Sequence, residues 1–226
     1  LVCCYSYIRI HRNEYTHFSL MELNVLLIII IVTVGVSLMA FNNRTMMDKM
    51  LYIPYDCKHN SNYSRIFSHI LIHADWGHLL FNMMSLYFLG EYLLYSFIFE
   101  YGAMMGQFHF LTLYLLGALF ATLIPYVRHQ DNPNYRSLGA SGAVSAVIFA
   151  AILWNPGMEI RLFFIPFAIP AYIFGPLYLL YEFYADKKGQ TGIAHDAHIG
   201  GAIFGIGYIL IIKSDKGMQF IETIFG

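Results

Sequence analysis

Charged residues are scarce in this sequence. Asp, Glu, Lys and Arg make up 12% of its 226 residues, against about 25% in average soluble domains. Hydrophobic residues make up 58%. So large a deficit of charge over so long a chain argues against a soluble protein. It indicates an integral membrane protein, and we expect the lipid bilayer to surround it.

The sequence also has few cysteines and no excess of positive charge. Cys3, Cys4 and Cys57 are too few and too unevenly placed for a disulfide framework. The net charge of −1 argues against a nucleic-acid partner, because such binding relies on surplus Lys and Arg. No residue pattern indicates a bound cofactor, so we expect none.

The first 20 residues differ from the rest of the chain. They mix charged, aromatic and cysteine residues without helical periodicity, and Met21 directly precedes the first apolar segment. We therefore treat 1–20 as an N-terminal extension of uncertain origin. We assign 21–226 to one transmembrane domain.

Apolar segments long enough to cross a bilayer recur six times. A helix needs about 20 apolar residues to cross it, and the segments lie at about 23–41, 67–89, 108–127, 138–154, 162–181 and 197–212. Pro166, Pro170 and Pro176 interrupt the fifth, so we expect that helix to be kinked or loosened. The long polar connection 42–66 is expected to have its own structure or role. The fold class predicted is an all-α membrane protein, a bundle of six transmembrane helices.

The second segment carries an unusual set of polar side chains: His69, His73, Asp75, His78 and Asn82. Polar groups at membrane depth normally face a protein interior or a water-filled cavity. His78 and Asn82 are four residues apart and share one helix face. His69 and His73 have the same spacing, which suits a metal ion. No carboxylate or cysteine shares their face, so we expect no metal site.

The fourth segment opens with Ser141 between Gly139 and Gly142. Neither glycine has a side chain that blocks access to the backbone. In the first turn of a helix, free N–H groups and the helix dipole favour a developing negative charge. Ser141 is thus a candidate nucleophile, while a simple packing face of small residues is the alternative.

The order of the segments places the polar groups together. Even-numbered segments enter the membrane from the same side, so His78, Ser141 and His198 are expected at one end of the bundle. His198 begins the sixth segment beside Gly201 and Gly205, a spacing that lets helices approach closely.

Histidine is the usual base for a serine nucleophile, and His198 is the candidate here. Asp196 lies two residues away and so does not share its helix face. A Ser141–His198 dyad is favoured over a triad. The Ser141 N–H, His78 and Asn82 are candidate donors to the oxyanion.

Three stretches, 73–82 (HADWGHLLFN), 139–142 (GASG) and 197–205 (AHIGGAIFG), resemble the signature stretches of rhomboid intramembrane serine proteases. They occur in that family's order, on the second, fourth and sixth helices. The resemblance extends over about 23–212 and implies a membrane-embedded first loop. It implies Ser141 as nucleophile, His198 as general base, and His78 with Asn82 as oxyanion donors.

Further residues follow from the resemblance. Gly139 is assigned to the oxyanion region, His73, Gly201 and Gly205 to structural roles near the site, and Arg65 to the embedded loop. Two positions depart from the family pattern. Ser145 stands where many relatives have an aromatic residue on the catalytic histidine, and Ser64 where a tryptophan often precedes the loop arginine. His198 would then need another partner.

The function expected is an intramembrane serine endopeptidase that cleaves transmembrane segments of other membrane proteins. We expect a bacterial-type cell membrane as its location, and the fifth helix with loop 185–196 as a moving gate and cap. A non-enzymatic relative that binds membrane-protein clients is one alternative. A histidine-lined metal or ion carrier is another.

Overall fold

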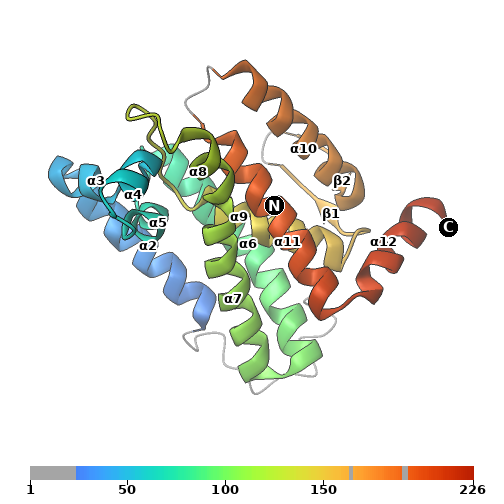
Figure 1. Cartoon of the computed structure of the whole chain (residues 1–226). Helices are drawn as coiled ribbons and strands as arrows, with labels where there is room; N and C mark the ends of the chain where they lie inside the picture. Colours follow the sequence, from blue (N-terminus) through green and yellow to red (C-terminus); the bar gives the residue numbers. More distant parts are fainter. Residues whose placement is uncertain (1–23, 163–164, 190–192) are drawn as a thin grey trace.

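The computed structural model describes residues 24–162, 165–189 and 193–226. Within these ranges the chain is mostly helical, with one short antiparallel pair of strands (Figure 1). The predicted α-helical class is confirmed. In chain order the elements are α2 (Val25–Phe41), α3 (Arg44–Met50), α4 (Pro54–His59), α5 (Arg65–Ser68), η1 (His69–Leu71), α6 (Trp76–Tyr101), α7 (Ala103–Ala121), α8 (Leu123–His129), α9 (Ser141–Trp154), β1 (Glu159–Ile160), β2 (Ile169–Pro170), α10 (Ala171–Lys188), α11 (His195–Ile212) and α12 (Asp215–Phe225).

Helix α9 is the centre of the bundle. Nearly all of its residues are buried, and it packs against α6, α7 and α11. Its sequence of alanine, valine, serine and large apolar residues carries no charge that would need water or a partner. Helix α2 lies on one side of this core, and α10 and α12 lie on the other (Figure 1). Ser141, at the start of α9, is therefore held by the most enclosed element.

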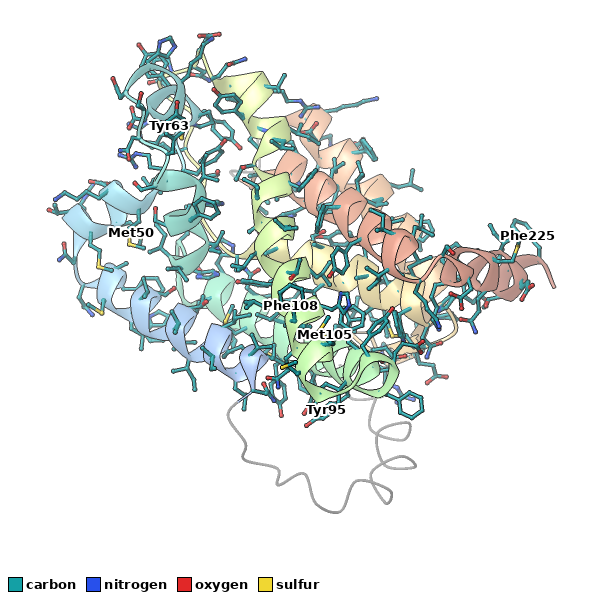
Figure 2. All side chains as sticks on the ribbon, turned by 60° about the horizontal axis from the view of Figure 1, so that its bottom comes forward. Met50, Tyr63, Tyr95, Met105, Phe108 and Phe225 are labelled. Carbon is teal, nitrogen blue, oxygen red and sulfur yellow. The ribbon has the colours of Figure 1, made fainter. Side chains whose placement is uncertain are left out.

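The outward faces of the helices carry large apolar side chains. Figure 2 shows Tyr95, Met105 and Phe108 at the surface of α6 and α7, and these side chains are 38%, 43% and 57% exposed. Since water does not favour such surfaces, they suit contact with lipid.

Among the described residues, two helical stretches are long and apolar enough to cross a membrane by length and composition: Ala103–His129, which joins α7 and α8, and α11. Helices α2 and α9 are apolar but shorter, with 17 and 14 residues. The count of six crossings stays a prediction.

The second predicted segment, 67–89, begins too early. The helix α6 starts at Trp76 and continues to Tyr101. Asp75 is its N-cap, with an extended backbone and a carboxylate that accepts the His78 N–H at 2.8 Å. His69 and His73 therefore lie ahead of α6 rather than on it.

The fifth predicted segment, 162–181, also begins too early. Ile169 pairs with Ile160 in the strand hairpin, and α10 starts at Ala171 directly after Pro170. Proline suits a helix start, because its missing N–H would have no partner inside the helix there. Within α10 only Pro176 remains, so the expected interruption by three prolines is wrong.

The connection 42–66 has its own structure, as expected. It contains α3, α4 and the start of α5. The buried Arg65 guanidinium holds it together by donating to the carbonyls of Asp48 and Leu51 at 2.9 and 2.7 Å and by pairing with Asp56 at 3.1 Å. A last helix, α12, lies beyond the six predicted segments.

Candidate active site

Helices α9 and α11 approach each other at backbone distance. A Cβ atom on Gly201 would overlap the carbonyl oxygen of Gly142, and one on Gly205 would overlap that of Ala146. A Cβ on Gly142 would meet the Ala197 carbonyl oxygen at 3.4 Å. The expected close approach at the sixth helix is confirmed. It brings together the helix starts that carry Ser141 and His198, the neighbours of Gly142 and Ala197.

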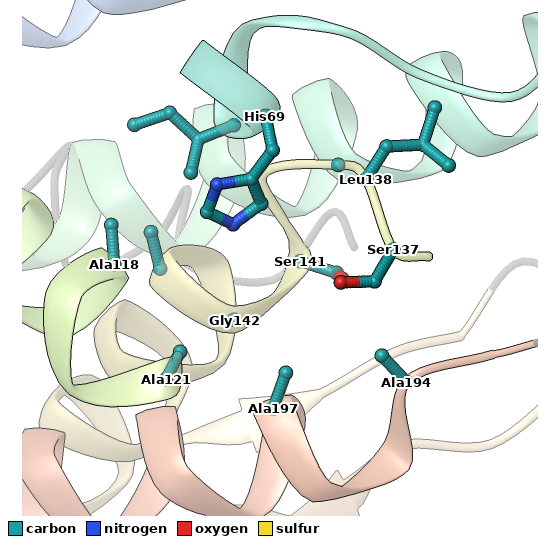
Figure 3. Close-up of a pocket in the computed structure, with 12 residues that line it drawn as sticks. His69, Ala118, Ala121, Ser137, Leu138, Ser141, Gly142, Ala194 and Ala197 are labelled. Carbon is teal, nitrogen blue, oxygen red and sulfur yellow. The ribbon is translucent and has the colours of Figure 1, made fainter. Parts of the chain in front are cut away.

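Ser141 lines a small pocket. It is the first residue of α9 and is partly buried. The pocket lies between the start of α9, the end of α7, the loop before α9 and the start of α11 (Figure 3). Its lining residues are His69, Ile70, Ala118, Ala121, Ser137, Leu138, Gly139, Ser141, Gly142, Ala143, Ala194 and Ala197. Most of these side chains are small, so they leave room beside the first turn of α9.

Gly139 is required by its conformation and by a close neighbour. Its φ of +112° is one that L side chains rarely adopt, and a Cβ would lie 2.6 Å from the His78 ring. Its N–H donates to the His69 carbonyl at 2.9 Å. Gly139 therefore admits the His78 ring beside the loop ahead of Ser141, and its own N–H is already engaged.

His73 ties three segments together. Its ring is fully buried, and its Nε2 accepts the Ala140 N–H at 3.4 Å. Its Nδ1 must then carry the proton, which it donates to the Ser37 hydroxyl of α2 at 3.0 Å. Ser37 in turn donates to the Leu71 carbonyl at 2.9 Å. This chain of hydrogen bonds fixes the loop ahead of Ser141.

The two expected oxyanion donors lie on α6. The rings of His78 and His73 are in edge-to-face contact, with centroids 5.0 Å apart. Asn82 is buried one turn further along, and its amide donates to the His78 carbonyl at 2.9 Å. His78 therefore faces the loop that leads to Ser141, with Asn82 directly behind it on the same helix.

His198 has a carboxylate partner from α10. Its Nδ1 lies 3.1 Å from Oε2 of Glu182, which is 3% exposed. His195, one turn earlier on α11, approaches the same oxygen at 2.6 Å through its Nδ1. The Tyr178 hydroxyl lies 3.5 Å from the His198 Nδ1. The Ser145 hydroxyl donates to the His198 carbonyl at 2.9 Å, so this departure from the family pattern anchors the backbone rather than the ring.

Asp196 does not serve His198. Its carboxylate accepts the Ala197 N–H at 2.9 Å and faces Arg128 and His129 of α8, both at 3.7 Å. The argument that residues two apart on a helix point in different directions is confirmed.

The rings of His69 and His73 make hydrogen bonds within the protein. The His69 Nδ1 donates to the Arg65 carbonyl at 2.9 Å, and both His73 nitrogens are engaged as described above. Burial lowers the pKa of His69 to about 4, so the ring is neutral near pH 7. Among the described residues, the donor atoms of Glu182, His195 and His198 are close enough together to hold a metal ion.

Two residues near the site were missed from the sequence. Glu182 is an acidic residue inside an aromatic-rich helix, and an ionisable group in such a segment is itself a sign of a functional site. The predicted fifth segment ends at residue 181, one residue before Glu182, so no role was assigned to Glu182. Ser37 carried no signal, because a single serine in an apolar helix is unremarkable.

Comparison with known proteins agrees with the sequence motifs. RHOMBOID-like protein 12, mitochondrial, of Arabidopsis thaliana is 29% identical over 211 residues, which cover 84% of this chain and 60% of that protein. Presenilin-associated rhomboid-like protein, mitochondrial, of Bos taurus is 31% identical over 149 residues, covering 65% of this chain and 38% of that protein. The human protein of the same name is 30% identical over 149 residues, with the same coverage.

These relatives are longer than this chain, and their names bear on its expected location. The chain spans 60% of the length of the plant relative and 38% of that of the bovine one. Both are named as mitochondrial, so the expected bacterial-type membrane has no support from them. The family model of the Rhomboid domain matches residues 60–215, which contain all three motifs and the whole pocket. The chain therefore belongs to the rhomboid family.

Proposed function

We propose that this protein is an intramembrane serine endopeptidase that uses Ser141 as nucleophile and His198 as general base. The observation that carries the proposal is the backbone contact between α9 and α11 at Gly142, Ala197 and Gly201. It holds the two helix starts together beside a pocket that Ser141 lines. Members of the rhomboid family are in general intramembrane serine proteases, which supports the same reaction here. Some rhomboid-like proteins are inactive.

The proposed chemistry needs one protonated and one free nitrogen on His198. Glu182 accepts from Nδ1, so Nε2 is left as the base. Nε2 takes the Ser141 proton as the hydroxyl oxygen attacks the peptide carbonyl carbon. It then gives that proton to the leaving amine, and water hydrolyses the acyl-enzyme in a second cycle of the same kind.

Negative charge on the tetrahedral intermediate needs nearby donors. The Ser141 N–H lies in the first turn of α9, where backbone N–H groups lack partners within the helix. The His78 side chain, brought close by Gly139, and the Asn82 amide are the proposed side-chain donors. His73 supports them through the loop rather than by contact with substrate.

The dimensions of α9 suit chemistry below the membrane surface. Its 14 residues span about 21 Å, less than the roughly 30 Å of a bilayer core. If the Trp154 end of α9 reaches one surface of the bilayer core, Ser141 lies inside the membrane, below the opposite surface. The small side chains around the pocket favour substrates that are small or helix-breaking at the scissile bond. A mitochondrial membrane, as in the names of the relatives, is the proposed location.

Access for a substrate helix is proposed to involve α10. It packs on α11 and only slightly on α9, and Leu177, Leu180 and Tyr184 on it are more than half exposed. The contact of Glu182 with α11 anchors the second half of α10, so opening would occur ahead of it, around Pro176. Residues 190–192 of the proposed cap lie outside the described residues.

The test is cleavage of a fluorescent transmembrane reporter in liposomes by the purified protein. We expect cleavage by the parent and none by Ser141→Ala or His198→Ala, each with a folded-state thermal transition like the parent's. Capture of reporters without cleavage, equal in all three proteins, would instead favour a client-binding rhomboid-like protein.

A further inference from the structure

The Glu182 carboxylate is the most unusual group next to the proposed catalytic pair. It belongs to α10, where exposed aromatic and leucine side chains surround it in sequence, yet it is 3% exposed. A buried carboxylate is costly unless hydrogen-bond donors surround it. Here the donors are the Nδ1–H groups of His195 and His198 and the hydroxyl of Tyr178.

We propose that Glu182 is a positioning residue that holds His198 in the tautomer and orientation of a general base. On this view, which rests on the proposed function, the site is a serine–histidine–glutamate triad rather than a dyad. Accepting the Nδ1 proton fixes the free electron pair on Nε2. The negative carboxylate also stabilises the imidazolium that forms when Ser141 gives up its proton.

The distances favour Glu182 as the partner of the His198 ring over two other nearby residues. The Tyr178 hydroxyl lies farther from Nδ1, at 3.5 Å against 3.1 Å for Glu182, and carries no charge. Asp196 faces α8 instead. Ser145 replaces the aromatic neighbour that many rhomboids have, and its hydroxyl donates to the backbone carbonyl of His198. The carboxylate therefore supplies the partner that the ring would otherwise lack.

A metal ion bound by the same three side chains fits the distances less well. In a tetrahedral zinc site, with bonds of about 2.0–2.2 Å, neighbouring ligand atoms lie about 3.3 Å apart. The His195 Nδ1 and the Glu182 oxygen are only 2.6 Å apart, which is a hydrogen-bond distance. The second histidine therefore acts as a further donor that keeps the carboxylate charged and fixed.

The experiment compares Glu182→Gln, Glu182→Asp and Glu100→Gln in the liposome cleavage assay. Glu100 is the matched control, because it is a glutamate in the last turn of α6 that pairs with Lys213 rather than with a histidine. We expect kcat to fall at least tenfold in Glu182→Gln with KM within twofold of the parent. Glu182→Asp, which keeps the charge, should recover part of kcat, and Glu100→Gln should stay within twofold.

Each outcome separates the possibilities. A kcat for Glu182→Gln within twofold of the parent overturns the positioning role while leaving the Ser141–His198 pair intact. No cleavage by the parent overturns both proposals. One equivalent of bound zinc in the purified parent, absent from Glu182→Gln, assigns the cluster to a metal and overturns the triad. If Glu182→Gln does not fold, Glu182→Asp decides: an unfolding temperature and KM like the parent's with a lowered kcat support positioning, and an unchanged kcat overturns it.

Discussion

The backbone contact between α9 and α11 gives a sharp prediction at Gly201. Replacing it with alanine adds one Cβ atom, which would overlap the carbonyl oxygen of Gly142 and lie 2.9 Å from its carbonyl carbon. Both atoms belong to the backbone of α9, so no side-chain rotation relieves the overlap. The variant can fold only if α9 and α11 move apart, and that movement separates the starts of the helices that carry Ser141 and His198.

The size of the effect follows from packing and from catalytic geometry. Overpacking a tight core costs about 1–3 kcal/mol. A displacement of about 1 Å between catalytic groups lowers the rate roughly 10²-fold. Gly201→Ala is therefore expected to lose both stability and activity. Gly207→Ala is the control on the same helix, since nothing lies within 4 Å of its added Cβ, and it should gain up to about 1 kcal/mol of helix propensity.

The assay pairs reporter cleavage in liposomes with thermal unfolding in detergent. Gly201→Ala should cleave about 10²-fold more slowly and unfold at a lower temperature, whereas Gly207→Ala should match or exceed the parent in stability and keep its activity. A Gly201→Ala variant with parental activity and unfolding temperature would refute the argument that this contact sets the geometry of the site.

Two further predictions concern the segment ahead of α6. Ser37→Ala removes the partner of the buried His73 Nδ1 and should cost about 1–3 kcal/mol of stability, with a lower cleavage rate. Ser37→Cys, which is similar in size, should have a stability between those of the parent and Ser37→Ala. An unchanged unfolding temperature in Ser37→Ala would contradict the role given to the hydrogen bond between Ser37 and His73. Acid should destabilise the protein through His69, whose pKa is about 4 when folded and 6.5 when unfolded. As pH falls, His69 takes up a proton in the unfolded chain before it does so in the folded protein. The contribution of neutral His69 to the free energy of unfolding, about 3 kcal/mol at most, is therefore complete above pH 6.5 and is lost progressively towards pH 4. The slope of unfolding temperature against pH in this window should be smaller in His69→Asn, and an equal slope would show that another group is responsible.

The bounds of α9 were predictable because their signals are local. Ser141 follows a Gly-Ala pair at the start of an uncharged segment, and α9 begins at that residue and ends at Trp154, where the segment was expected to end. The glycines of the sixth segment likewise predicted the contact that α9 and α11 make. In both cases neighbouring residues along the chain carry the information.

Helix boundaries were less predictable where apolar residues continue through a turn. Residues 67–72 are mostly apolar, and so they read as part of the second span, but Asp75 caps the helix and starts it only at Trp76. The cap could have been recognised from an aspartate ahead of a long apolar run. Pro170 gave a similar signal for α10.

The Glu182–His198 contact was beyond reach of the sequence. The two residues come from different helices, and their meeting depends on how α10 packs on α11. Periodicity within either helix does not contain that information. The same holds for Ser37, which meets His73 only because α2 packs beside the loop ahead of α6.

The central claim is that His198 activates Ser141, and covalent labelling tests it most directly. The purified protein in liposomes would be treated with a fluorophosphonate and its peptides analysed by mass spectrometry, beside His198→Ala. We predict a single adduct on Ser141 in the parent and at least tenfold slower labelling in His198→Ala. An adduct on a different residue, or labelling of Ser141 at the same rate in both proteins, would contradict the account.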